Sequence, residues 1–280
     1  MSLSGELSVG RTSAIRWVRE WREPGRSWFR VGREGDWLVA EWEGVGTLRA
    51  HVLACRSPEI SPAEGLDPED EEKWRRGPVR ALVRHLAGAS SLHASAISVN
   101  GRALAFLGES GVGKSTCAAD ICMRTGASLL ADDIAEIEEN DGRFVVRVSE
   151  SAHWLLPDAQ KQLGFADLPP SVKSRVPARR IAMSAMPLGG IVTLAFSDEL
   201  ARPVLTPVYG HGAFLAVSSS YVRFVLDDQT VWQRDLETIG RLVATTPVYA
   251  LLRPRAFEQL PQASELLAPL LNVAPRSEAR

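Results

Sequence analysis

The sequence ALAFLGESGVGKSTCAADICMR, residues 103–124, decides how this chain folds. Its central part, Gly108–Ser115, reads GESGVGKS and fits the pattern G-x-x-x-x-G-K-[ST] at every fixed position. An apolar run that predicts a strand, Ala103–Leu107, precedes it, and a segment that predicts a helix, Cys117–Arg124, follows it. In this order of strand, loop and helix, backbone N–H groups and the positive end of the helix dipole converge on one point. The motif therefore predicts a binding site for phosphate.

The residue types within the motif predict ATP and Mg²⁺ as the ligands. Lys114 supplies a mobile positive charge for the β- and γ-phosphates. The hydroxyl of Ser115 is a suitable Mg²⁺ ligand. The predicted nucleotide-binding residues are Gly108, Glu109, Ser110, Gly111, Val112, Gly113, Lys114, Ser115 and Thr116.

Two adjacent carboxylates follow the next predicted strand. After a glycine that predicts the end of the helix, Gly126, the short apolar run Ser128–Ala131 leads directly into Asp132 and Asp133. A crossover helix returns the chain parallel to its first strand, so the carboxyl end of the new strand is expected beside the phosphate loop. There, one carboxylate can hold Mg²⁺ and the other can take a proton from an attacking hydroxyl.

A predicted β-hairpin places His93 at the same site. Asn100-Gly101, between two strand-like runs, is a strong signal for a two-residue turn. Counting outward from that turn places His93 opposite Gly108, at the start of the loop. We therefore predict an active-site role for His93 and structural roles for the other histidines, which are His51, His85, His153 and His211.

The rest of the chain indicates an α/β protein with a small β-rich amino-terminal module. We expect residues 1–75 to form this module and an acidic linker, and residues 76–280 to form the catalytic domain. The stretch Ser57–Glu72 is rich in proline and acidic residues and is interpreted as the solvated linker. Further strands are expected at Ser27–Val31, Trp37–Trp42, Ile134–Glu138, Phe144–Val148, Ile191–Phe196 and Val248–Leu252, and helices at 78–87 and near Val231–Val243.

Composition narrows the cellular setting. With 45% hydrophobic and 24% charged residues, the 280-residue chain is typical of a globular protein, and its net charge of −2 offers no general basis for binding nucleic acid or an anionic membrane. The start of the sequence lacks the apolar core of a signal peptide, and no apolar run approaches the ~20 residues of a membrane helix. Cys55, Cys117 and Cys122 form no disulfide framework. We therefore expect a cytoplasmic protein.

His93, Gly108–Ser115 and the sequence LADD at 130–133 together resemble the catalytic half of HPr kinase/phosphorylase. That family phosphorylates a serine of a small carrier protein, and its P-loop fold is related to that of phosphoenolpyruvate carboxykinase. The resemblance is strongest over residues 78–138. It implies that His93 and Lys114 are active-site residues, that Ser115 holds Mg²⁺, and that Asp133 accepts the proton with Asp132 as its close partner. It also implies that Asp158 occupies the position of a further acidic metal ligand, and that copies of the chain assemble, because HPr kinases are hexameric.

The sequence departs from HPr kinase after the aspartate pair. It lacks the glycine-containing substrate signature of that family and instead has HWLLPDAQKQLG (153–164), KSRVPARR (173–180) and PVYALLRPRAFEQL (247–260). These segments are more similar to smaller HPr-kinase-related proteins, some of which phosphorylate a serine of a lasso-peptide precursor. The basic residues of the second segment, Lys173, Arg175, Arg179 and Arg180, are expected either to meet phosphate or an acidic substrate, or to be solvated.

The expected function is transfer of the γ-phosphoryl of ATP to a serine hydroxyl of a peptide or small protein. Two alternatives stay open at this point: a kinase for the hydroxyl of a small molecule, and a regulator that binds ATP and transfers nothing. The second aspartate and the expected position of His93 favour transfer.

Overall fold

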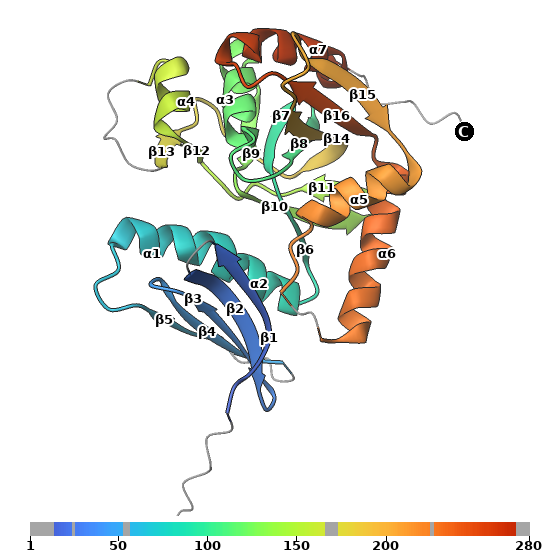
Figure 1. Cartoon of the computed structure of the whole chain (residues 1–280). Helices are drawn as coiled ribbons and strands as arrows, with labels where there is room; N and C mark the ends of the chain where they lie inside the picture. Colours follow the sequence, from blue (N-terminus) through green and yellow to red (C-terminus); the bar gives the residue numbers. More distant parts are fainter. Residues whose placement is uncertain (1–13, 24–25, 53–56, 166–172, 225–226, 273–280) are drawn as a thin grey trace, which may run out of the picture. The chain divides into compact units, whose positions relative to one another are not determined.

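The computed structural model describes residues 14–23, 26–52, 57–165, 173–224 and 227–272. The chain divides into two compact units, Met1–Leu86 and Ala87–Arg280 (Figure 1). The start of the sequence, residues 1–13, and Cys55 lie outside the described residues.

The N-terminal unit contains an antiparallel meander, which confirms the expected β-rich character of this region. Among its described residues, five strands pair in chain order: β1 (Arg16–Glu23), β2 (Arg26–Glu34), β3 (Trp37–Trp42), β4 (Gly46–His51) and β5 (Glu59–Pro62). Apolar side chains from one face of this sheet are buried, including Phe29, Val31, Ala40, Trp42 and Leu48.

A helical segment covers this apolar face. It consists of α1 (Pro68–Trp74), a π-helical turn (Arg75–Val79) and α2 (Arg80–Leu86). Trp74, which is 3% exposed, packs edge-on against Trp42 with ring centroids 5.5 Å apart. The unit therefore has its own aromatic core.

The interpretation of Ser57–Glu72 as a solvated linker is wrong, because this stretch contains β5 and most of α1. The Asp67 carboxylate accepts a 2.8 Å hydrogen bond from the Glu69 N–H, and Pro68 opens the first turn. Three of the acidic residues of this stretch, Glu69, Asp70 and Glu71, lie in that turn, where the helix dipole favours negative charge. Because helical structure continues to Leu86, the two units separate after Leu86 and not after residue 75.

The C-terminal unit is a mixed α/β domain, which confirms the α/β part of the predicted fold class. Among its described residues, one nine-stranded sheet contains the order β6-β10-β11-β14-β8-β7-β9, and β16 pairs with both β14 and β15. The bounds of these strands are β6 Ser90–His93, β7 Ser95–Val99, β8 Arg102–Leu107, β9 Ser128–Ala131, β10 Ile134–Asn140, β11 Arg143–Val146, β14 Met186–Phe196, β15 Val204–Val208 and β16 Val248–Arg253. A separate pair is formed by β12 (Ala152–Leu155) and β13 (Ser174–Pro177).

Helices lie on both faces of this sheet (Figure 1). Leu104 and Phe106 of β8 pack with residues of α3 and α7, whereas Ala105 and Leu107 pack with residues of α5 and α6. Burial on both faces explains why the β8 sequence is an unbroken apolar run. The helices are α3 (Lys114–Thr125), α4 (Pro157–Gln162), α5 (Gly210–Ser220), α6 (Gln229–Thr245) and α7 (Leu260–Asn272), with a 3₁₀ turn at Phe257–Gln259.

The chain passes from β8 through α3 to β9, as expected, but β9 is not the immediate neighbour of β8. β7 lies between them and pairs antiparallel with both. β8 and β9 therefore run in the same direction, and their carboxyl ends lie at the same edge of the sheet.

The hairpin prediction is confirmed near its turn and wrong at its far end. Val99 pairs with Arg102 across Asn100-Gly101, and Ser95 pairs with Phe106. Beyond Ser95 the chain leaves β8, because the Ala94 N–H donates a 3.1 Å hydrogen bond to the Asp133 carbonyl. The preceding residues form β6, and His93 pairs with Ile134 of β10 rather than with Gly108.

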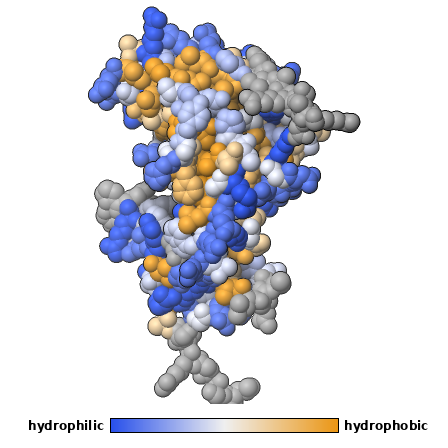
Figure 2. Space-filling model, turned by 90° about the vertical axis from the view of Figure 1, so that its right-hand side faces the viewer, coloured by the Kyte–Doolittle hydropathy of each residue, from blue (hydrophilic) through white to orange (hydrophobic). Residues whose placement is uncertain are grey.

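Figure 2 shows one face of the molecule, on which hydrophobic residues of the C-terminal unit reach the surface among hydrophilic ones. Large apolar side chains exposed in this unit include Met183, Tyr209 and Leu215. Among the described residues, no helix is both long and apolar enough to span a membrane.

Candidate active site

The Gly108–Ser115 loop joins the end of β8 to the start of α3 and requires glycine at several positions. Gly108, Gly111 and Gly113 have φ values of 138°, 80° and 92°, which side-chain-bearing residues rarely adopt. A Cβ atom on Gly108 would lie 2.7 Å from the Leu194 carbonyl oxygen, and one on Gly113 would lie 2.5 Å from Nη2 of Arg253. The loop thus packs closely against β14 and β16 while its backbone turns into the first turn of α3.

Lys114 lies within the curve of this loop. Its side chain is largely buried, and Nζ donates hydrogen bonds to the carbonyls of Gly108 (2.8 Å) and Glu109 (3.0 Å). Burial lowers the pKa of the Lys114 ammonium, and the nearby Asp133 carboxylate opposes that shift. The ammonium is therefore held at the start of α3, close to the carboxylates.

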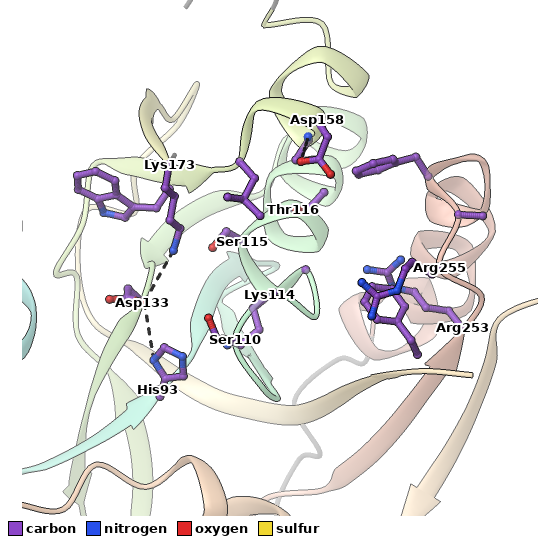
Figure 3. Close-up of a pocket in the computed structure, with 18 residues that line it drawn as sticks. His93, Ser110, Lys114, Ser115, Thr116, Asp133, Asp158, Lys173, Arg253 and Arg255 are labelled. Carbon is purple, nitrogen blue, oxygen red and sulfur yellow. Dashed lines mark hydrogen bonds and ion pairs between the residues drawn. The ribbon is translucent and has the colours of Figure 1, made fainter. Parts of the chain in front are cut away.

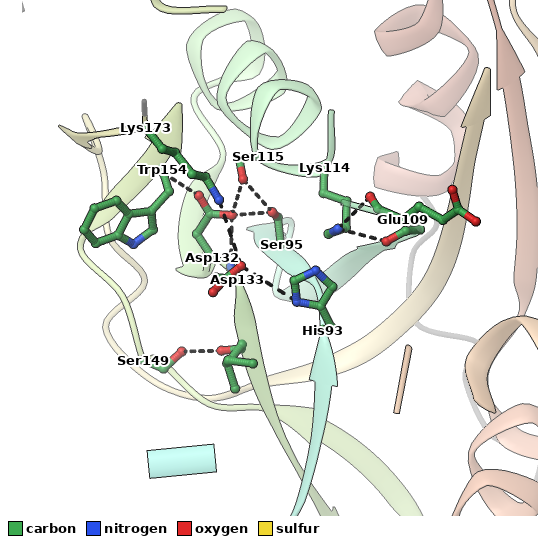
Figure 4. Close-up of polar contacts among 12 residues, drawn as sticks. His93, Ser95, Glu109, Lys114, Ser115, Asp132, Asp133, Ser149, Trp154 and Lys173 are labelled. Carbon is green, nitrogen blue, oxygen red and sulfur yellow. Dashed lines mark hydrogen bonds and ion pairs between the residues drawn. The ribbon is translucent and has the colours of Figure 1, made fainter. Parts of the chain in front are cut away.

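The Asp132 carboxylate connects the loop to three strands (Figure 4). Asp132 is 2% exposed, and its Oδ1 accepts a 2.8 Å hydrogen bond from the Ser115 hydroxyl and another from the Ser95 hydroxyl of β7. Its Oδ2 accepts a 2.6 Å hydrogen bond from the backbone N–H of Trp154 in β12. These donors fix the orientation of the Asp132 side chain, which follows β9. Its Oδ1 contacts the Ser115 hydroxyl, which the motif predicts to be a Mg²⁺ ligand.

Asp133 is arranged differently, although it is the next residue. Its φ is 76°, an uncommon value for a residue with a side chain, and its carboxylate is 34% exposed. Asp133 Oδ1 lies 3.7 Å from His93 Nδ1 and 3.9 Å from Lys173 Nζ (Figure 3). The strained turn thus directs the two neighbouring carboxylates to different surroundings, one buried and one facing the pocket.

His93 faces the same pocket as Lys114 and Asp133. Burial lowers the pKa of its imidazole, Asp133 opposes that shift, and the charges of Lys114 and Lys173 reinforce it. The imidazole is therefore neutral at pH 7 and can both donate and accept a hydrogen bond. His93 lines the pocket although the predicted register is wrong, because β6 reaches the site through its pairing with β10.

These groups line a pocket of about 270 Å³, close to the lower end of the usual range for small-molecule sites. His93, Asp133 and Lys173 lie at one end of it, and Arg253 and Arg255 lie across the loop at the other (Figure 3). The lining residues are His93, Ser110, Gly111, Gly113, Lys114, Ser115, Thr116, Asp133, Trp154, Leu156, Asp158, Ala159, Lys173, Phe196, Arg253, Arg255, Ala256 and Phe257.

The oxygen atoms of Ser115 and Asp132 fit a Mg²⁺ site, because a hydroxyl and a carboxylate are hard ligands and here lie in direct contact. Asp158 lines the same pocket from the first turn of α4, where its Oδ1 accepts a 2.8 Å hydrogen bond from the Ala159 N–H. Within the described parts of the chain, no group of three or more His, Cys, Asp or Glu side chains is placed to hold a metal ion. Phosphate oxygens and water would complete the coordination of Mg²⁺ at such a site.

The basic residues of segment 173–180 lie in different surroundings, and one of them lines the pocket. Lys173 lines the pocket, whereas Arg175 donates a 2.8 Å hydrogen bond to the Ser151 hydroxyl. Arg180 donates to the Gly126 carbonyl at 3.3 Å, and Arg179 lines a different cavity. Only the first residue of the segment therefore has a position suited to the chemistry predicted here.

Several residues of the site were not singled out from the sequence. Ser95 is one of these residues. The signal that could have found it is its position on the strand-like run before the hairpin turn, from which its side chain faces α3. Phe196, Arg253 and Arg255 are others. Phe196 ends one predicted strand, and the two arginines follow another; both strands reach the loop through long-range pairing that local patterns do not reveal. Cys117 and Cys122 are buried, and burial raises the pKa of each thiol to about 12.

One family model matches the segment of the chain that contains this site. Residues 84–156 match the family model of the HPr serine kinase C-terminal domain, a segment that contains His93, the glycine-rich loop and both aspartates. Among curated proteins, none matches the chain. The solved structure of the HPr(Ser) kinase/phosphatase from Coxiella burnetii is similar over 65% of this chain and 96% of its own, with 11% identity and a TM-score of 0.36.

The fold and the site thus define a mixed α/β protein with a glycine-rich loop, a lysine and an aspartate pair at one sheet edge. The matched segment, residues 84–156, is similar to the C-terminal domain of HPr serine kinase, which confirms the resemblance inferred from its motifs.

Proposed function

We propose that this protein is a kinase that transfers the γ-phosphoryl of ATP to a serine hydroxyl of a peptide or small protein. The observation that carries the proposal is that the two adjacent aspartates lie in different surroundings. Asp132 is buried against the Ser115 hydroxyl, whereas Asp133 faces the pocket beside His93 and Lys173. A site that only bound nucleotide would need the first arrangement and not the second.

In this mechanism the backbone N–H groups of the loop and the Lys114 ammonium bind the phosphates. Mg²⁺, held by Ser115 and Asp132, would neutralise charge on the β- and γ-phosphate oxygens. Asp158 is a further proposed ligand on the pocket wall, acting directly or through water.

The chemical step requires one proton acceptor. The serine oxygen attacks the γ-phosphorus, the bond from that phosphorus to the β–γ bridging oxygen breaks, and ADP leaves with its electron pair. The proton of the serine hydroxyl passes to the Asp133 carboxylate. Neutral His93, 3.7 Å from that carboxylate, positions it, and the Lys173 ammonium lies 3.9 Å from the same carboxylate.

The preference for a serine acceptor rests on the HPr-kinase-like segment and on the departure of the downstream sequence from HPr kinase itself. A peptide natural-product precursor is the proposed acceptor class. We further propose that the protein is cytoplasmic, that neither nucleic acid nor a membrane is its partner, and that copies of the chain assemble. Exposed apolar side chains on β15 and α5, such as Val204 and Leu215, offer a surface for that assembly.

The test uses ATP labelled at the γ-phosphate, Mg²⁺, and an array of serine peptides with matched alanine peptides. The parent protein should label serine peptides only, and Asp133→Asn should bind ATP normally while transfer falls about 10²-fold or more. Label on small hydroxyl compounds but on no peptide would favour a small-molecule kinase. ATP binding without any transfer would favour a regulator, and parental transfer by Asp133→Asn would remove this residue as the base.

A further inference from the structure

The pocket extends past the loop to a second end, away from Asp133 and His93. This end is formed by Phe196, the last residue of β14, and by Arg253, Arg255, Ala256 and Phe257 at and after the end of β16. Figure 3 shows Arg253 and Arg255 on the opposite side of the loop from Asp133 and His93. Two arginines and two aromatic side chains thus line a wall of the pocket outside the segment that matches the kinase family.

Both guanidinium groups of this wall lie against the Phe196 ring. The Cζ atom of Arg253 lies 4.6 Å from the ring centroid, and the Cζ atom of Arg255 lies 4.3 Å from it. Both distances are within the range of favourable cation–π contacts. The exposed guanidinium of Arg255 is therefore supported on an aromatic ring at the mouth of the pocket.

Arg253 fixes this wall to the loop. It is 4% exposed, and its Nη2 donates a 3.0 Å hydrogen bond to the Val112 carbonyl inside the loop. Its Nε is buried and has no hydrogen-bond partner among the residues that the structure describes. A buried donor without a partner is costly, so an acceptor atom of a bound ligand would stabilise this arrangement.

The direction of a nucleotide in the pocket follows from the proposed function, on which this inference rests. The γ-phosphate belongs beside Lys114 and Asp133, and the preceding phosphates continue along the start of α3 past Ser115 and Thr116. The ribose and base must then leave the loop on the side away from Asp133. That side is the wall formed by Phe196, Arg253, Arg255 and Phe257.

We propose that this wall is the base-binding site of the nucleotide, with the Arg255 guanidinium, supported by Phe196, stacking on the purine ring. A planar guanidinium stacks on a base through its face, which an ammonium cannot do. The buried Nε of Arg253 donates to an oxygen of the same nucleotide. Stacking of this kind is worth about tenfold or more in affinity.

The test compares two ligands, ATP and inorganic tripolyphosphate, whose difference is the nucleoside. Binding to the full-length parent protein and to Arg255→Lys, Arg255→Ala and Phe196→Leu is measured by calorimetry with Mg²⁺. Arg255→Lys keeps the positive charge and removes the flat group, so it separates stacking from charge. Arg202→Ala, at an exposed arginine that does not line this pocket, is the control.

Arg255→Lys and Phe196→Leu should weaken ATP about tenfold and leave tripolyphosphate within about twofold of the parent. An equal loss for both ligands would show that Arg255 binds phosphate and would overturn the base site. Unchanged ATP affinity in Arg255→Lys and Arg255→Ala would overturn it as well. Failure of the proposed function is seen separately, as ATP binding by the parent without transfer of the γ-phosphoryl to serine peptides. A parent protein that binds neither ATP nor tripolyphosphate would overturn both proposals.

Discussion

Ser115 Oγ donates a 2.8 Å hydrogen bond to Asp132 Oδ1, which joins the end of the glycine-rich loop to the end of β9. The two residues are seventeen positions apart in the chain and meet because β8 and β9 run in the same direction. The contact places a hydroxyl and a carboxylate where one Mg²⁺ can bind both.

Asp132→Asn should raise the Mg²⁺ concentration required for tight ATP binding by about tenfold or more. The change removes the negative charge of Asp132. It also replaces one accepting oxygen with an NH₂ group, which cannot accept the hydrogen bonds that Ser115, Ser95 and Trp154 donate to this side chain. ATP titrations at several Mg²⁺ concentrations measure the effect. Asp133→Asn is the matched control and should keep the parental Mg²⁺ dependence, whereas the reverse result would mean that the two roles are exchanged.

Lys114→Ala should weaken ATP binding about tenfold or more while the protein stays folded. The substitution removes a full charge that lies within the curve of the loop and contacts its carbonyls. Calorimetry measures the affinity, and circular dichroism checks the fold. Lys161→Ala, at an exposed position on α4, is the control for loss of a lysine. Equal affinities in Lys114→Ala and the parent would contradict the assignment of the loop.

His93→Ala should lower kcat about 10- to 10³-fold with little change in melting temperature. The imidazole lies 3.7 Å from the Asp133 carboxylate, and its side chain is 38% exposed, so it adds little to the core. Single-turnover transfer and thermal unfolding separate the two effects. A loss of stability with kcat preserved in the folded fraction would instead assign His93 a structural role.

Local sequence patterns predicted the parts of the site that neighbouring residues determine. The loop, the aspartate pair and the Asn100-Gly101 turn each depend on residues close together in the chain, and all are found where they were expected. The change of neighbouring strand at Ala94, from β8 to β10, could not be predicted in this way. It depends on the Asp133 carbonyl, which becomes available only when β9 has been placed.

Residues brought in by distant strands were also beyond prediction. Arg253 reaches the loop because β16 pairs with β14, and β14 pairs with β8, over separations of many residues. The acidic stretch Ser57–Glu72 differs from its prediction for another reason: its composition is typical of a solvated linker, but it also contains a helix-start signal. Asp67 followed by Pro68 is a capping pattern that outweighs the charge of the residues after it.

The free energy of unfolding of the metal-free protein should depend on pH partly through His153. This side chain is 3% exposed, and burial lowers its pKa from 6.5, with the Asp132 carboxylate opposing that shift. Since the folded pKa is the lower one, this contribution to stability is fully present above pH 6.5 and is lost as pH falls below it. Urea unfolding at pH 7.5 and pH 5.5, in chelator, measures the loss.

His153→Gln removes this titration, so the variant should lose less stability than the parent over that interval. His153→Leu serves the same purpose if the glutamine variant folds poorly. Identical pH dependence in the parent and in either variant would contradict the prediction. The other histidines are present in all three proteins, so their contributions cancel in the comparison.

Trp74→Ala should destabilise the N-terminal unit by about 3–5 kcal/mol, the usual cost of removing a large buried aromatic side chain. Trp74 packs edge-on against Trp42, and its indole Nε1 has no hydrogen-bond partner among the described residues. Trp74→Phe should therefore cost much less, because it keeps a ring and loses no hydrogen bond. Trp28→Ala, at a position 39% exposed, is the control and should cost less than Trp74→Ala. Urea unfolding measures all three, and a Trp74→Ala protein as stable as the parent would contradict the aromatic core described here.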